Sequence, residues 1–173
     1  MPESYRPHLR KDDTETRTAS QTVASNTTHG NARVRDLLRG KTGTLHTIRP
    51  QQTLHEAVEM LRDHNIGALP VTDATGALIG ILSERDIVRK LADTPGRTLP
   101  HKVEEVMTRK VETCVAEELL VTVLKRMTEG RFRHMPVVEG EALVNLVTIG
   151  DLVHFRLTEL ELEALQIKQL IVG

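Results

Sequence analysis

Aromatic residues are almost missing from this chain of 173 residues. Tryptophan is absent, and the whole complement is Tyr5, Phe132 and Phe155. Proteins that bind single-stranded nucleic acid stack bases on aromatic side chains, and those that bind duplexes carry an excess of basic charge. The formal net charge here is −1, so no nucleic-acid partner is expected. The core must be built from aliphatic residues and methionine.

Cysteine, histidine pairs and long apolar runs are also scarce. Cys114 is the single cysteine, which excludes an intramolecular disulfide and a cysteine-rich zinc site. The eight histidines form no H-x-x-x-H pair, so no metal site is expected. No apolar run approaches the roughly 18 residues that span a bilayer, and the start of the chain lacks a signal-peptide or transit-peptide pattern. We expect a cytoplasmic protein without membrane contact.

Common catalytic and nucleotide-binding signatures are missing as well. The chain has no G-x-x-x-x-G-K-[ST] phosphate loop, no G-x-S-x-G nucleophile elbow and no G-x-G-x-x-G fingerprint. No combination of nucleophile, base and orienting group can be found. We therefore predict no enzyme and no catalytic residue, and any NAD binding would not be Rossmann-like.

What the chain does contain is one unit written twice. Pro70 aligns with Pro136 and Asp86 aligns with Asp151, with one turn residue lost in between. The aligned stretches are residues 47–88 and 113–153, each preceded by a further matched segment, VRDLLRGK from Val34 and VEEVMTRK from Val103.

Each copy shows the same succession of apolar patterns. An amphipathic helix is predicted where apolar residues recur at i, i+3, i+4 and i+7. The residues are Leu54, Ala57, Val58 and Leu61 in the first copy and Leu120, Val123, Leu124 and Met127 in the second. A short extended piece precedes each helix, and two short strands and a second helix follow it. The predicted fold class is α/β (α+β), with two tandem β-α-β-β-α repeats related by a pseudo-two-fold axis and an extended C-terminal helix.

Composition divides the chain into five segments. A polar start predicts a disordered tail, and a stretch with two prolines and a glycine predicts a linker. The segments are a tail at 1–32, repeat one at 33–93, a linker at 94–102, repeat two at 103–156 and a C-terminal helix extension at 157–173.

The C-terminal helix carries apolar residues at alternating spacings of four and three, which is typical of a heptad seam. They are Val153, Leu157, Leu160, Ala164, Ile167 and Ile171. The first repeat has no counterpart to this extension. Two interpretations stay open, namely a helix that packs on its own domain and a helix that packs against a second subunit.

The repeat motifs carry a family resemblance. NIGALPV from Asn65 with GILSERDIV from Gly80, and GRFRHMPVV from Gly130 with LVTIGDLV from Leu146, resemble the CBS (cystathionine-β-synthase-type) domain. Two such copies over residues 34–156 are similar to the CBS pair, or Bateman module, of small stand-alone bacterial proteins. The resemblance implies a homodimer and an adenine nucleotide bound between the repeats. AMP is the first expectation, ATP and NAD(H) come next, and S-adenosylmethionine follows them.

Two S/T-x-x-D sequences stand where a strand meets a helix. Asp86 and Asp151 would accept the ribose hydroxyls, and Ser83 and Thr148 would bond ribose or phosphate near a helix N-terminus. The alternative is a capping box that serves only the helix. The two interpretations do not exclude each other.

A basic cluster precedes the third predicted strand. Arg131 and Arg133 could clamp a phosphate, and His134 could donate to it. The alternative is a solvated basic turn. Repeat one has an uncharged segment at this position, so the two sites should differ. Arg85 is the only comparable positive charge beside Asp86, the expected ribose acid of repeat one.

The adenine ring is expected to meet backbone and aliphatic side chains, since Phe132 is the one aromatic residue that could stack on it. Gly67 and Ala68 would allow close approach of the backbone. Ile66, Met135 and Leu82 would pack against the ring. Asn145 departs from the family pattern, because it replaces the glycine found at Gly80 in the first copy.

The leading hypothesis is a regulatory module that senses an adenine nucleotide and signals to a regulated protein of unknown identity. The alternative is a ligand-free scaffold that acts through its C-terminal helix.

Overall fold

The computed structural model describes residues 31–172, so most of the predicted tail at 1–32 lies outside the described residues. The elements in chain order are α1 (Val34–Arg39), α2 (Leu54–His64), β1 (Ala68–Thr72), β2 (Leu78–Ser83), α3 (Glu84–Asp93), α4 (Val103–Val106), α5 (Leu120–Gly130), β3 (His134–Glu139), β4 (Ala142–Thr148) and α6 (Ile149–Val172). This order confirms the two repeats, the mixed α+β class and the C-terminal helix.

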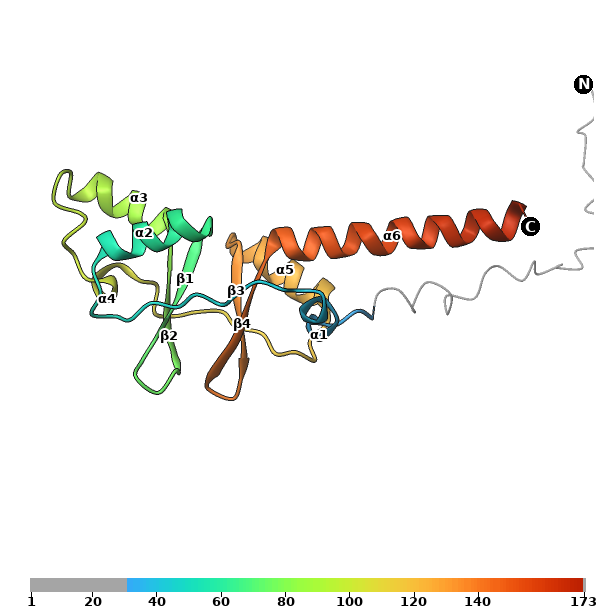
Figure 1. Ribbon diagram of the computed structural model, residues 1–173, viewed down its shortest axis with the longest axis horizontal. Helices are drawn as coiled ribbons and strands as arrows, with labels where there is room; N and C mark the ends of the chain where they lie inside the picture. The colour runs from blue at the N-terminus through green and yellow to red at the C-terminus, as the bar shows by residue number, and fades with distance from the viewer. Residues whose placement is uncertain (1–30, 173) are drawn as a thin grey trace, which may run out of the picture.

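Two antiparallel hairpins form the centre of the fold. β1 pairs with β2 and β3 pairs with β4, and a bridge between Ala77 and Ala142 joins the two hairpins. Figure 1 shows the hairpins beside each other, with α2 and α3 near the end of the first and α5 and the start of α6 near the end of the second. The short extended piece predicted ahead of the first helix of each copy forms only a single parallel bridge, at Ile48 and at Cys114.

The short helix ahead of each repeat packs in the core of the other repeat. Val34 of α1 lies in the core that contains Met127, whereas Val103 of α4 lies in the core that contains Leu54. Backbone bonds fix both exchanges: the Val34 amide donates to the Glu118 carbonyl at 3.0 Å, and the Val103 amide donates to the Gln52 carbonyl at 2.8 Å. The sequence segments 33–93 and 103–156 are therefore not the packing units.

This exchange determines the path of residues 40–47. α1 belongs to the second core, and Ile48 belongs to the first. The connection between them must cross from one repeat to the other. It does so along the boundary between the repeats, where Lys41 and His46 line the same cavity.

Both long repeat helices end in the left-handed conformation next to this boundary. α2 ends at Asn65 (φ 52°) and α5 ends at Arg131 (φ 56°). Asparagine adopts this conformation readily, whereas an arginine there is uncommon. Each reversal directs the chain into β1 or β3, so the segments that precede these strands face each other across the boundary.

α6 packs on its own repeat only over its first turns. Leu152 is buried in the second core, and Phe155 lies against it. Beyond this point the helix extends past the body of the repeat (Figure 1), and its large apolar residues from Leu157 onward are exposed. The interpretation that the whole seam packs on its own domain is therefore wrong for this part of the helix.

Gly80 is a position where the fold requires the absence of a side chain. A Cβ atom there would lie 2.6 Å from Met107 Sδ and 3.2 Å from the backbone oxygen of Thr108. The methionine can move, but the backbone oxygen is held by the pairing of Thr108 with Ile81. Gly80→Ala should lower the free energy of unfolding by about 1–3 kcal/mol, the usual range for overpacking.

Urea denaturation would measure this loss. Gly40→Ala is the matched control, because its Cβ would meet only the Leu37 oxygen at 3.8 Å, and its φ of −90° suits alanine. Equal stability of the two variants would contradict the close packing at Gly80.

Candidate functional site

A cavity of about 270 Å³ lies between the two repeats. It is built from the crossing connection, from the segment before β1 and from the second repeat. The lining residues are Lys41, Gly43, Thr44, Leu45, His46, Asn65, Ile66, Gly67, Ala68, His134, Asn145, Leu146 and Thr148. Five residues predicted for the site are thus brought together here, namely Ile66, Gly67, Ala68, His134 and Thr148.

The two repeats lie close together at Gly67. A Cβ on this residue would lie 3.3 Å from His134 Cε1 and 3.6 Å from Glu84 Oε2. The carbonyl of Gly67 accepts from the Glu84 amide at 3.1 Å, and the carbonyl of Arg133 accepts from the Ile149 amide at 2.9 Å. These equivalent bonds hold the segments before β1 and β3 against the starts of α3 and α6.

The acid of the second repeat stands at the start of α6. Asp151 Oδ2 accepts from the Thr148 amide at 2.9 Å, and the Asp151 amide donates to Thr148 Oγ1 at 3.0 Å. The predicted capping interaction is therefore present. Asp151 lines a hollow of about 570 Å³ that shares Lys41 and Gly43 with the cavity between the repeats.

Lys41 is the residue at this site that the sequence reasoning missed. Its Nζ donates to Asp151 Oδ2 at 2.6 Å and to the Leu146 carbonyl at 2.6 Å. The matched segments VRDLLRGK and VEEVMTRK both end in lysine, at Lys41 and Lys110. That repetition was a usable signal, but the contact depends on the crossing connection, which no local pattern reveals.

The lysine controls the ionisation of the aspartate. Burial by itself would raise the pKa of Asp151, but the bonds from Lys41 and the Thr148 backbone outweigh it, so the pKa lies below its ordinary value. The carboxylate is therefore held in its charged form, next to a partly buried cation.

The acid of the first repeat has the same cap but no lysine. Asp86 Oδ2 accepts from the Ser83 amide at 2.9 Å and from Ser83 Oγ at 2.6 Å. Lys110, the counterpart of Lys41, is exposed and makes no hydrogen bond or ion pair with any residue in the described part of the chain. The pseudo-symmetry is thus broken at the carboxylates.

One hydrogen bond joins the basic cluster of the second repeat to the first repeat. Arg85 Nη1 donates to the Arg131 carbonyl at 3.1 Å, which joins the helix that carries Asp86 to the segment before β3. Ser83, Arg85, Asp86, Arg131 and Arg133 do not line the cavity between the repeats. These five residues form a second cluster, which the bond from Arg85 to the Arg131 carbonyl joins across the repeats.

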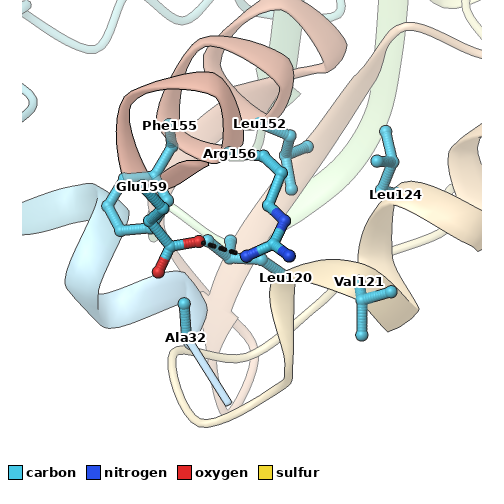
Figure 2. A pocket seen from close by; sticks show the side chains of 8 residues that line it. All are labelled: Ala32, Leu120, Val121, Leu124, Leu152, Phe155, Arg156 and Glu159. Atoms are coloured by element: carbon cyan, nitrogen blue, oxygen red, sulfur yellow. Dashed lines mark hydrogen bonds and ion pairs between the residues drawn. The ribbon is translucent and has the colours of Figure 1, made fainter. Parts of the chain in front are cut away.

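A third hollow, of about 210 Å³, lies away from both aspartates between α5, α6 and Ala32. Figure 2 shows its aliphatic and aromatic lining from Leu120, Leu124 and Phe155, with Arg156 turned toward Glu159 at 3.1 Å. Its charged residues already bond each other, and its surface is apolar, so it offers no group suited to a ribose or a phosphate.

A family model described as the CBS domain matches residues 34–93 and 103–158. The chain belongs to the CBS-domain family. It is 35% identical over 105 residues to the CBS domain-containing protein CBSX3, mitochondrial, of Arabidopsis thaliana, in a match that covers 58% of this chain and 51% of that protein. The chain thus spans about half the length of this relative.

Solved structures show the same fold. A CBS-domain containing protein, ATU1752 from Agrobacterium tumefaciens, is 38% identical with a TM-score of 0.69, and the match covers 72% of this chain and 99% of that one. The CBS domain pair of MJ0100, solved with 5′-methylthioadenosine and S-adenosyl-L-methionine, is 30% identical with a TM-score of 0.63 and covers 72% and 94%. CBS pairs are generally regulatory rather than catalytic.

Within this CBS pair, His134 is adapted to be neutral. Burial lowers the pKa of its imidazole, and the nearby Glu84 carboxylate offsets only part of this effect. The lowered pKa favours the neutral form of the ring over the protonated donor that was the expectation from the sequence.

Two of the residues predicted to pack against adenine have no exposed surface. Met135 and Leu82 are both fully buried, the first in the core of the second CBS repeat and the second in the core of the first. Neither side chain can contact a ligand in this conformation, whereas Ile66 lines the cavity. Phe132 packs against the second core.

Among residues 31–172, no group of three or more potential metal ligands occurs. Within the same range, no helix is long and apolar enough to cross a membrane.

Removing Lys41 should raise the pKa of Asp151. In Lys41→Met the carboxylate loses its charged partner and keeps its burial, so it will bind a proton at a higher pH than in the wild-type protein. A ¹³C NMR titration of the Asp151 carboxyl would measure the change. Lys110→Met serves as the control and should leave this titration unaltered. Identical Asp151 titrations in wild type and Lys41→Met would show that the contact is unimportant in solution.

Proposed function

We propose that this CBS pair is a non-enzymatic regulatory module that binds an adenine nucleotide between its repeats and signals occupancy to a partner protein. The observation that carries the proposal is the composite cavity. Thr148 and the adjoining Asp151 of one repeat stand across from the Ile66–Gly67 backbone of the other, so a ligand there would touch both repeats.

The ribose would bind at Asp151. One carboxylate oxygen is used by Thr148 and Lys41, while Oδ1 accepts no hydrogen bond from any described residue. A carboxylate that accepts from both cis hydroxyls uses both oxygens, so the sugar would compete with Lys41 for Oδ2. A displaced Lys41 ammonium would then be free to pair with the phosphate of the same ligand.

The adenine ring would lie on the side of the first repeat. Ile66 supplies an aliphatic surface there, and Gly67 keeps the backbone open to close approach. The cavity of about 270 Å³ is near the lower end of the range for small-molecule pockets, and it opens past Lys41 into the neighbouring hollow. Together the two volumes suit a mononucleotide.

The second cluster would bind a ligand differently. Ser83 and Asp86 offer the same ribose contacts, and Arg85, Arg131 and Arg133 supply three guanidinium groups, whereas Lys41 is the cationic side chain that lines the cavity between the repeats. A phosphate-rich ligand would be favoured there. The breaking of the pseudo-symmetry therefore supports either two different ligands or a single occupied site.

AMP is the proposed ligand, with ATP or NAD(H) as the next candidates. All of them share the adenosine group that the aspartate and the aliphatic surface would recognise. The MJ0100 pair, which is similar in sequence and fold, is named as a complex with two adenosine compounds, one of them S-adenosylmethionine. We place S-adenosylmethionine last because its cationic sulfonium would lie near Lys41 in the cavity or near the arginines of the second cluster.

Binding would be transmitted by the bridge that the ligand makes between the repeats. A ligand shifts a conformational equilibrium only by its differential affinity for the two arrangements, typically about 1–3 kcal/mol. The functional consequence that we propose is the regulation of a partner protein in the cytoplasm.

Isothermal titration with AMP, ATP, NAD⁺, NADH and S-adenosylmethionine should detect binding, most strongly for AMP. Asp151→Ala should weaken the binding by about 10- to 100-fold, because charge-assisted bonds of about 1.5–3 kcal/mol are lost. Asp93→Ala, which removes an exposed carboxylate at the end of α3, is the control and should bind as the wild type does. No heat and no thermal shift with any of the five compounds would refute the proposal.

The scaffold alternative is favoured by one observation, the exposed apolar surface of α6. The double substitution Asp86→Ala and Asp151→Ala, compared with truncation after Arg156, separates the two functions. A sensor should lose nucleotide-dependent regulation in the double variant and keep its oligomeric state, as measured by light scattering. If only the truncation abolishes partner binding, the scaffold function is the correct one.

A further inference from the structure

The exposed part of α6 is an unpartnered apolar surface. The helix is anchored by Leu152 in the second core and then runs beyond the repeat (Figure 1). Leu157 is 54% exposed and Ile171 is 78% exposed. The match to the Agrobacterium structure covers 99% of that chain but 72% of this one. The family model ends at residue 158, so this part of α6 lies beyond the shared domain.

Five of the apolar residues form a stripe with a heptad repeat, while the exposed Leu162, Leu165 and Leu170 lie outside it. Leu157, Ala164 and Ile171 occupy the a positions, and Leu160 and Ile167 occupy the d positions. All five are exposed in the single chain. Because the first turns are held by the domain, the helix does not have to form in isolation, which is unfavourable for so short a segment. A preformed helix with apolar residues at its a and d positions is suited to pair with a second helix as a coiled coil.

The charges beside the seam define how two copies would fit. In a parallel pair, each g residue faces the e residue five positions further along the other helix. Arg156 at g would face the partner's Glu161 at e, and Glu163 at g would face the partner's Lys168 at e. Both pairs join opposite charges. Glu163 Oε1 lies 3.8 Å from Arg156 Nη1 of its own helix and accepts no hydrogen bond from a described residue. Lys168 of a second helix would place a further cation beside this carboxylate.

An antiparallel pair fits less well. The register that brings Glu161 opposite Lys168 leaves Leu157 outside the overlap of the two seams. It also places Glu163 opposite Leu170 rather than opposite a cation. The parallel register keeps the whole stripe and complements every charge at the e and g positions from Arg156 to Lys168.

We propose that α6 pairs with α6 of a second copy of this chain as a parallel, in-register coiled coil through the stripe from Leu157 to Ile171. This pairing is independent of nucleotide binding. The sequence left two interpretations open, packing on the same domain and packing against a second subunit, and this proposal selects the second. The two CBS pairs would then lie at the same end of the coiled coil.

A matched pair of substitutions tests the surface. Leu160 is 43% exposed and lies in the stripe, whereas Leu165 is 55% exposed and lies at the b position outside it. Leu160→Glu should raise the dimer dissociation constant, measured by sedimentation velocity, by at least about tenfold, because it places a charge in the seam. Leu165→Glu should leave it within about twofold of the wild type.

Circular dichroism melts should show that both variants stay folded, because both side chains are exposed in the single chain. A monomeric wild-type protein, or equal effects of Leu160→Glu and Leu165→Glu, would overturn the proposal. Titration with AMP in parallel keeps the two hypotheses separate, since Leu160→Glu should bind AMP as the wild type does even when the dimer is lost.

The orientation is tested by charge exchange. Lys168→Glu should weaken the dimer, and adding Glu163→Lys should restore it if the helices are parallel. Restoration by Glu161→Lys instead would indicate an antiparallel pair and overturn this orientation. Ile171→Cys should form a disulfide with its own copy under mild oxidation, while the wild type should not, because Cys114 is buried. Cross-linking only in a mixture of Ile171→Cys and Leu160→Cys chains would also overturn the parallel orientation.

Discussion

The reciprocal exchange of the two short helices is the constraint on which the rest of this structure depends. α1 completes the core of the second repeat, and α4 completes the core of the first, so neither hydrophobic core can close without residues from the other half. Each repeat of about 60 residues would be marginal alone, since small domains bury too little surface to offset chain entropy. The exchange therefore makes the two repeats a single folding unit.

The same exchange builds the candidate site. The connection at residues 40–47 has to cross between the repeats, and it carries Lys41 to Asp151. Its counterpart in the second copy does not bring Lys110 to Asp86, because no described residue bonds to that lysine. Two sequence-related sites thus differ in electrostatics. One has an aspartate already paired with a lysine, and the other has an aspartate next to Arg85, which donates to the Arg131 carbonyl of the opposite repeat.

α6 connects the candidate site with the end of the chain. Its first turn holds Asp151, its next turns pack on the second core, and its remaining length is exposed. The aspartate therefore stands at the base of the helix that we propose to join two copies. Regulation and assembly would share one rigid element, although the two proposals can fail separately.

The sequence alone determined the repeat, the family and the type of each helix. These follow from local rules: the apolar spacing of Leu54, Ala57 and Leu61, the capping pairs Ser83–Asp86 and Thr148–Asp151, and the doubled motif order. The sequence did not reveal which core each short helix joins. Val34 and Val103 enter the core of the other repeat because of long-range packing, which their neighbours in the chain do not encode. Tertiary structure alone decided that Lys41 meets Asp151, that Met135 is buried and that Arg85 bonds the Arg131 carbonyl of the opposite repeat. The physical reason is that these contacts join residues far apart in the chain, and only the exchange of α1 and α4 brings them together.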